Sequence, residues 1–114
     1  MAKSYKIPSA DDVLDVARCF QYVARQWHPY FRLSLTVPFG GKGDRKWQNL
    51  SKIVQFRDEL GMDEYDLYRY FDFVIERVSQ VWGSPYYWLQ CASSRKWLNK
   101  FLETGVLQWN KKKG

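Results

Sequence analysis

The chain has 114 residues, of which 46% are hydrophobic and 26% charged, and it carries a formal net charge of +6. This length fits a single domain spanning residues 1–114, and the composition argues against wholesale disorder. No segment approaches the run of about 18 apolar residues that crosses a bilayer, and residues 1–6 lack the apolar core of a signal peptide. We therefore expect a cytoplasmic protein without membrane contact, and the excess of bases favours a polyanionic partner.

The first predicted element is a helix that begins near Ser9 and ends at Trp27 or His28. Ser9 can cap it, acidic residues occupy its first turn, and Pro29 disfavours its continuation. Apolar residues recur at intervals of three and four positions, which predicts one buried stripe. The stripe is made of Val13, Ala17, Phe20, Ala24 and Trp27.

Residues 31–37 then alternate between apolar and polar side chains, a period typical of a half-buried strand. A single strand needs a partner, and residues 106–109 are the remaining candidate for a short β-hairpin. An extended loop is the alternative interpretation, and it is the preferred one. A glycine-rich turn follows at residues 38–43.

Caps, apolar periodicity and stop signals predict four further helices, at residues 44–60, 63–82, 85–91 and 95–104. Gly61, Gly83 and Gly105 each follow one of them as a stop. Trp82 completes the apolar face of the third helix. The predicted fold is all-α, a compact bundle of about five helices with the hairpin as an optional addition and residues 110–114 as a frayed basic tail.

Charge is distributed unevenly along these elements. Residues 1–60 contain ten bases and six acids, residues 61–83 two bases and five acids, and residues 84–114 six bases and one acid. Such segregation favours one face for a polyanion and another face, along the acidic third helix, for a different partner. Solvated helix faces without any partner are the alternative.

The last third of the chain mixes aromatic rings with cations. Tyr86, Tyr87 and Trp88 are consecutive, and a helix cannot bury three neighbours, so at least one ring should be exposed and free to stack on a base. Arg95, Lys96 and Lys100 lie about one turn apart and can follow a phosphate backbone. The predicted nucleic-acid-binding residues are Lys42, Arg45, Lys46, Tyr86, Tyr87, Trp88, Arg95, Lys96, Lys100, Lys111, Lys112 and Lys113.

The first three of these residues belong to a glycine-rich loop and the helix start that follows it. Glycines let backbone amides approach a phosphate, and the helix dipole adds to the attraction. The spacing does not match a nucleotide-hydrolysing P-loop. Contact with a phosphate backbone and a plain flexible linker are both compatible with residues 40–46.

Catalytic and metal-binding patterns are absent from the sequence. His28 is the only histidine, and Cys19 and Cys91 are isolated within apolar segments, so no zinc spacing arises and both thiols are expected to stay reduced. Paired carboxylates occur at helix starts or on exposed faces, where capping explains them. We expect no enzyme activity, no cofactor and no metal.

From Trp47 onward the pattern is similar to that of a known module. An early Trp with Leu50 and a Gly stop, a helix ending in a Trp-containing segment, and a Ser-capped helix with Leu98, Lys100 and Phe101 together resemble the C-terminal helical module of DnaD-type primosome proteins and phage replisome organisers. The resemblance covers residues 47–105. It implies contact with DNA, often single-stranded, and with a replicative helicase, with Arg95, Lys96 and Lys100 forming the basic helix.

These observations lead to two functional hypotheses. The first is a small nucleic-acid-binding accessory protein, encoded by a phage or mobile element, that acts in DNA replication or its control and favours single-stranded DNA. The second is a protein–protein regulator that inhibits a host replication, transcription or defence enzyme, supported by the acidic third helix and the surplus of rings.

Overall fold

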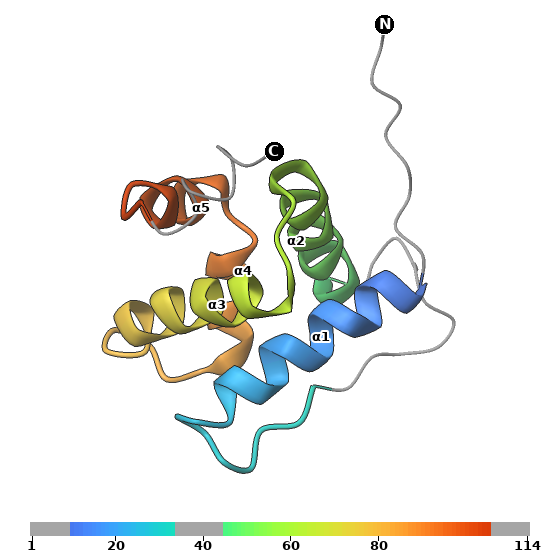
Figure 1. The fold of residues 1–114 in the computed structure, drawn as a ribbon. Coiled ribbons are helices and arrows are strands. Elements are labelled where there is room, and N and C mark those ends of the chain that lie inside the picture. The colour runs from blue at the N-terminus through green and yellow to red at the C-terminus, as the bar shows by residue number, and fades with distance from the viewer. Residues whose placement is uncertain (1–9, 34–44, 106–114) are drawn as a thin grey trace, which may run out of the picture.

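The computed structural model of the protein describes residues 10–33 and 45–105, and within them all regular structure is helical (Figure 1). The five helices are α1 (Ala10–Ala24), α2 (Arg45–Leu60), α3 (Glu64–Val78), α4 (Pro85–Ala92) and α5 (Arg95–Leu102). The predicted all-α bundle is confirmed. Residues 31–33 adopt no strand. The rest of the hairpin candidate, the Ser9 cap and the 110–114 tail lie outside the described residues.

Local signals place most of the helix ends. Gly61 follows α2 with φ 65°, a left-handed conformation that a residue with a side chain adopts only at a cost. Asp63 opens α3 with a reciprocal capping box, in which the Asp66 N–H donates to Asp63 at 2.9 Å and the Asp63 N–H donates to Asp66 at 3.1 Å. Ser94 caps α5 by accepting a hydrogen bond from the Lys96 N–H at 3.1 Å.

Two helices end earlier than predicted, which exposes two tryptophans. α1 stops at Ala24 and α3 at Val78, and each is followed by a tighter turn instead of further helix. Trp27 is therefore 38% exposed and Trp82 59% exposed, so the prediction that both lie in the core is wrong. The apolar periodicity continues through these turns because their hydrogen bonds keep nearly helical spacing, and periodicity alone cannot separate the two structures.

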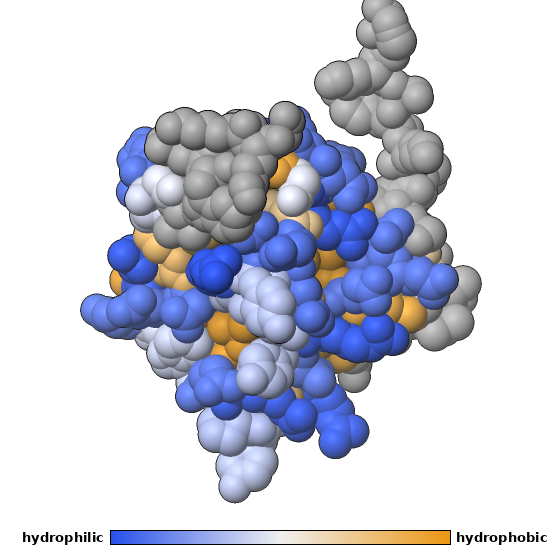
Figure 2. Space-filling model, viewed as in Figure 1, coloured by the Kyte–Doolittle hydropathy of each residue, from blue (hydrophilic) through white to orange (hydrophobic). Residues whose placement is uncertain are grey.

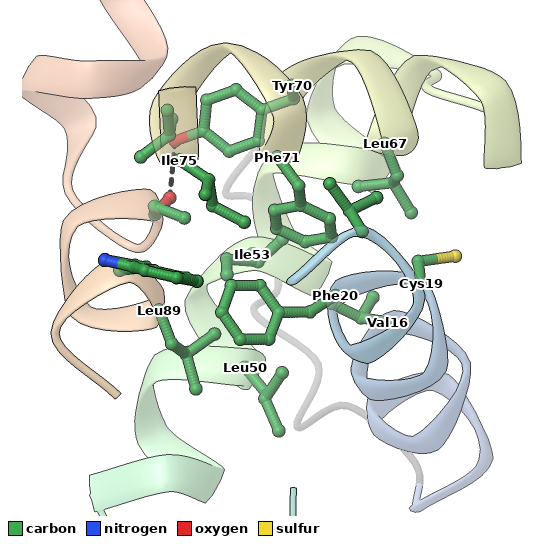
Figure 3. Packing of buried hydrophobic residues seen from close by; sticks show 14 of the residues in the cluster. Val16, Cys19, Phe20, Leu50, Ile53, Leu67, Tyr70, Phe71, Ile75 and Leu89 are labelled. Carbon is green, nitrogen blue, oxygen red and sulfur yellow. Dashed lines mark hydrogen bonds between the residues drawn. The ribbon is translucent and has the colours of Figure 1, made fainter. Parts of the chain in front are cut away.

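The core forms around α3, which packs against α1, α4 and α5, while α2 packs against α1 and α4. Figure 3 shows Phe20 of α1 pointing toward Phe71 of α3; their centroids are 5.3 Å apart in an edge-to-face arrangement. Tyr70 is fully buried, and its hydroxyl donates a hydrogen bond to the carbonyl of Ala92 at the end of α4. This contact fixes α4 against α3.

Polar contacts attach the remaining described segments. Arg57 of α2 reaches Asp12 of α1 at 2.9 Å, and the Leu33 N–H donates to the Gln21 side chain at 2.8 Å, which holds the segment after α1 against that helix.

Cys19 and Cys91 are both free thiols, as predicted. None of the described helices has the length and apolar character needed to cross a bilayer, and the face seen in Figure 2 is mainly hydrophilic with small, separate hydrophobic areas.

Candidate nucleic-acid interface

Two adjoining pockets lie between α2 and α4, and we call the surface they form the α2–α4 groove. The smaller one, the aromatic pocket, has a volume of about 300 Å³ and the larger one, the polar pocket, about 710 Å³. They share Arg45, Asn49 and Gln90, so they form a continuous surface. The remaining lining residues are Lys46, Gln48, Lys52, Gln55, Phe56, Trp82, Tyr86, Tyr87, Leu89, Ser93, Ser94 and Arg95.

Helical spacing brings these side chains to one surface. Arg45, Asn49, Lys52 and Phe56 follow one another at intervals of three and four residues, so they share one face of α2. On α4 the buried residues, including Trp88, Leu89 and Ala92, take one side of the helix. The exposed residues of the other side, Tyr86, Tyr87 and Gln90, complete the groove together with the largely buried Leu89.

The lining of the groove is strongly basic. Four of its side chains are cations, namely Arg45, Lys46, Lys52 and Arg95, and no acid among the described residues lines either pocket. Arg45 starts α2 and Arg95 starts α5, so two segments far apart in the sequence contribute to the same positive surface. The guanidinium of Arg95 lies 4.9 Å from the centroid of Phe56, and it pairs with Glu59 at 3.1 Å.

Three aromatic rings at one end of the groove are accessible. Tyr86 is 44% exposed and Tyr87 38% exposed, which confirms that at least one ring of the consecutive trio reaches the surface, and Trp82 joins them. Trp88 is 2% exposed, and its indole N–H donates to the Trp82 carbonyl at 2.7 Å. The predicted stacking role of Trp88 is therefore wrong, because α4 turns this ring into the core.

The exposed rings are held in place by neighbours. Tyr86 packs edge-on against Phe31 at 5.5 Å, and the ammonium of Lys46 lies 5.7 Å from its centroid. Tyr87 contacts Trp82 at 6.3 Å. A hydrogen bond to the Cys91 sulfur raises the pKa of Tyr87, and burial raises the pKa of Cys91, so both groups are neutral at pH 7.

The other predicted cations lie elsewhere. Lys96 and Lys100 are exposed but line neither pocket. The ammonium of Lys100 lies 5.3 Å from the centroid of Trp97, which in turn contacts Phe73 of α3, so Lys100 lies on the α3 side of α5. Lys42 and lysines 111–113 fall outside the described residues. The basic helix therefore divides its charges between two sides.

Five of the groove residues were predicted from the sequence, namely Arg45, Lys46, Tyr86, Tyr87 and Arg95, and the other ten were missed, among them Asn49, Lys52, Trp82 and Gln90. Lys52 was detectable, since it lies seven residues after Arg45 and so two helical turns along the same face. Trp82 was assigned to the core on periodicity. Asn49 and Gln90 carry no local signal, because their importance comes from the helix that faces them.

A separate cluster of tyrosines lies on α1 and α3. The ring of Tyr68 contacts Tyr22 at 5.2 Å and Tyr65 at 6.1 Å, and the last two are 60% and 65% exposed. Partial burial, together with a hydrogen bond to Glu64, raises the pKa of Tyr68 to about 12. A pocket of about 440 Å³ between the same helices contains Asp15, Arg18, Asp63 and Glu64 among its lining residues, so it carries both signs of charge.

The acidic character of α3 is weaker than its composition indicates. Asp66 is buried within the capping box and also contacts Arg69 at 3.2 Å, and Glu76 contacts Arg77 at 3.6 Å. Burial and the nearby Glu76 raise the pKa of Asp72. The helix therefore neutralises part of its own charge.

Over residues 10–33 and 45–105, no group of three or more His, Cys, Asp or Glu side chains comes together as a metal site. His28 is exposed at the turn after α1. Comparison with protein-family models, curated proteins and solved structures finds no match to this chain.

Proposed function

We propose that the protein is a small nucleic-acid-binding accessory protein that binds single-stranded DNA along the α2–α4 groove. One observation carries this proposal: Arg45, Lys46, Lys52 and Arg95 line the same groove as the exposed rings of Trp82, Tyr86 and Tyr87, and within residues 10–33 and 45–105 no acid lines it. Cations that follow a backbone beside stacking rings are the combination that single-strand binding requires.

The two contributions act differently on affinity. Each cation that neutralises a phosphate releases a condensed counterion, so its effect fades as salt rises. Each base stacked on a ring adds about 1–3 kcal/mol that depends little on salt. A duplex would offer the phosphates but keep its bases stacked on one another, so the rings favour an unpaired strand.

DNA replication or its control is the process we infer for this binding, with a phage or mobile element as the source of the chain and a replicative helicase as a protein partner. The support is the resemblance of residues 47–105 to the helical module of DnaD-type primosome proteins and phage replisome organisers. The positions that carry the resemblance include Trp47 and Leu50 of α2 and Leu98 and Phe101 of α5, helices that flank the groove.

The test removes charge from the groove and, separately, an equal charge from elsewhere. In the first variant the four groove cations are replaced by Gln: Arg45→Gln, Lys46→Gln, Lys52→Gln and Arg95→Gln. The matched control replaces four arginines that do not line the groove. They are Arg18 in α1, Arg25 in the turn after it, and Arg69 and Arg77 in α3. Both variants lose the same net charge.

The readout is the slope of log affinity for single-stranded DNA against log salt concentration. Each phosphate contact contributes about −0.7 to this slope, so losing four should flatten it by about 2.8, whereas the control should keep the wild-type slope. Equal slopes for the two variants would show that binding depends on net charge and not on the groove.

A second candidate function, regulation of another protein, is favoured by the tyrosine cluster of α1 and α3. Exposed tyrosines that pack on one another supply a large contact area at low entropic cost, as interface cores do. The double variant Tyr22→Ala and Tyr65→Ala tests it. A protein partner retained after nuclease treatment, lost with this variant and kept with the four-Gln groove variant, would support regulation over nucleic-acid binding.

A further inference from the structure

We propose that the aromatic pocket holds one unpaired nucleobase and recognises its edge through the side-chain amides of Gln90 and Asn49. This inference rests on the proposed function, since it assigns part of the single strand to a defined position in the α2–α4 groove. It adds base recognition to a mode of binding that otherwise depends on charge and stacking alone.

The shape of the pocket suits a flat ring. Its volume of about 300 Å³ lies at the small end of ligand pockets. Tyr86 and Tyr87 point from α4 in directions about 100° apart, as consecutive helical residues do, and Trp82 packs beside Tyr87 at 6.3 Å. Phe31 supports the Tyr86 ring from outside the pocket. A base that enters therefore meets rings already held in position.

Gln90 places an unoccupied amide beside these rings. It lies four residues after Tyr86 and three after Tyr87, so its side chain occupies the same exposed face of α4. Gln90 is exposed, and its side chain makes no hydrogen bond within the described residues. Such an amide offers one donor and one acceptor side by side, which is the pairing that glutamine and asparagine make with base edges.

Asn49 supplies a second amide to the same pocket. The Ser93 hydroxyl lies 3.2 Å from its Oδ1, but its single proton is also within reach of the Gln90 carbonyl, at 2.7 Å, so the two acceptors share one donor from α4. Its Nδ2 group has no acceptor within the described residues and remains available as a donor. Two amides from facing helices, beside two cations of the same pocket, Arg45 and Lys46, can hold a base while its phosphate is neutralised.

The experiment compares the wild type with two single variants on oligonucleotides of about 12 nucleotides, within the usual site sizes of single-strand binders. Gln90→Ala removes the edge contact, and Gln55→Ala is the matched control, since Gln55 lines the polar pocket but not the aromatic one. The probes are homopolymers of each base and an abasic strand of equal charge. Affinity is measured by fluorescence anisotropy.

We expect the wild type to bind at least one homopolymer about 5- to 150-fold more tightly than the abasic strand, and to discriminate among the homopolymers. Gln90→Ala should reduce that discrimination toward unity with an unchanged salt slope, while Gln55→Ala retains it. Equal affinity of the wild type for abasic and base-containing strands would overturn the base site and leave electrostatic binding intact. Absence of binding to every strand at low salt would overturn the proposed function as well.

Discussion

Replacing Tyr70 by Phe tests the contact that holds α4, and with it one wall of the groove, against α3. The Tyr70 hydroxyl donates to the Ala92 carbonyl, and Tyr70 and Ala92 are both fully buried. Ala92 ends α4, so its carbonyl lacks an intrahelical donor, and no backbone N–H of the described residues bonds to it. The Phe variant keeps the ring contacts with Phe71 and Phe101 and removes only this hydrogen bond.

The expected cost follows from leaving one buried carbonyl unpaired, which is about 1–3 kcal/mol. For a domain of this size that corresponds to a melting temperature lower by about 4–12 °C. Equilibrium urea unfolding, followed by circular dichroism, gives the free energy directly, and the denaturant dependence should stay unchanged because the buried surface is the same.

Tyr22→Phe is the matched control, since this hydroxyl belongs to a tyrosine that is 60% exposed. Its free energy of unfolding should stay within about 0.5 kcal/mol of the wild type. Equal stability of Tyr70→Phe and the wild type would refute the reasoning, because it would mean that the Ala92 carbonyl needs no donor at this position.

Three further predictions concern single positions. Gly61→Ala should lower the free energy of urea unfolding by about 1–2 kcal/mol because φ is 65° at that position. At Gly83 an added Cβ meets open space and φ is not positive, so Gly83→Ala should change this free energy by no more than about 0.5 kcal/mol. Equal effects of the two substitutions would contradict the backbone argument. Burial raises the pKa of Cys19 to about 11, so the thiol of the unfolded chain ionises at lower pH than that of the folded chain. The free energy of unfolding should therefore fall between pH 9 and 11, and it should fall less steeply in Cys19→Ala. Parallel profiles of unfolding free energy against pH for the two proteins would show that this thiol does not contribute. Trp88→Phe should lower stability by about 1–3 kcal/mol through the lost indole hydrogen bond and packing, yet leave DNA affinity unchanged; weaker binding at unchanged stability would return this ring to the interface.

The sequence determined where most of the helices lie, although not the ends of α1 and α3, because its signals are local. The cap at Asp63 and the glycine after α2 act within a few residues, and both are present in the fold. Helix α4 begins at Pro85 as predicted, although the Ser84 side chain makes no capping hydrogen bond. The core stripe of α1 from Val13 to Ala24 was also predictable, since a period of 3.6 residues leaves only one face for burial.

The candidate interface was only partly predictable. Three consecutive rings on one helix require that at least one is exposed, but which of Tyr86, Tyr87 and Trp88 turns inward depends on where α4 meets its neighbours. The core predicted for α3 did not include Tyr70. A buried tyrosine hydroxyl needs a hydrogen-bond partner, and the partner of Tyr70 is the carbonyl of Ala92 in another helix, which the local sequence does not indicate.

Local patterns thus placed the helices of the described residues, apart from the C-terminal ends of α1 and α3, and showed that the chain carries excess positive charge beside aromatic rings. Tertiary packing alone decided that Arg45 and Arg95 line one groove while Lys100 lies toward α3, and that Trp82 is exposed while Trp88 is buried. The physical reason is that a helix fixes the direction of each side chain only about its own axis, whereas the faces that become buried are chosen by contacts between helices distant in sequence.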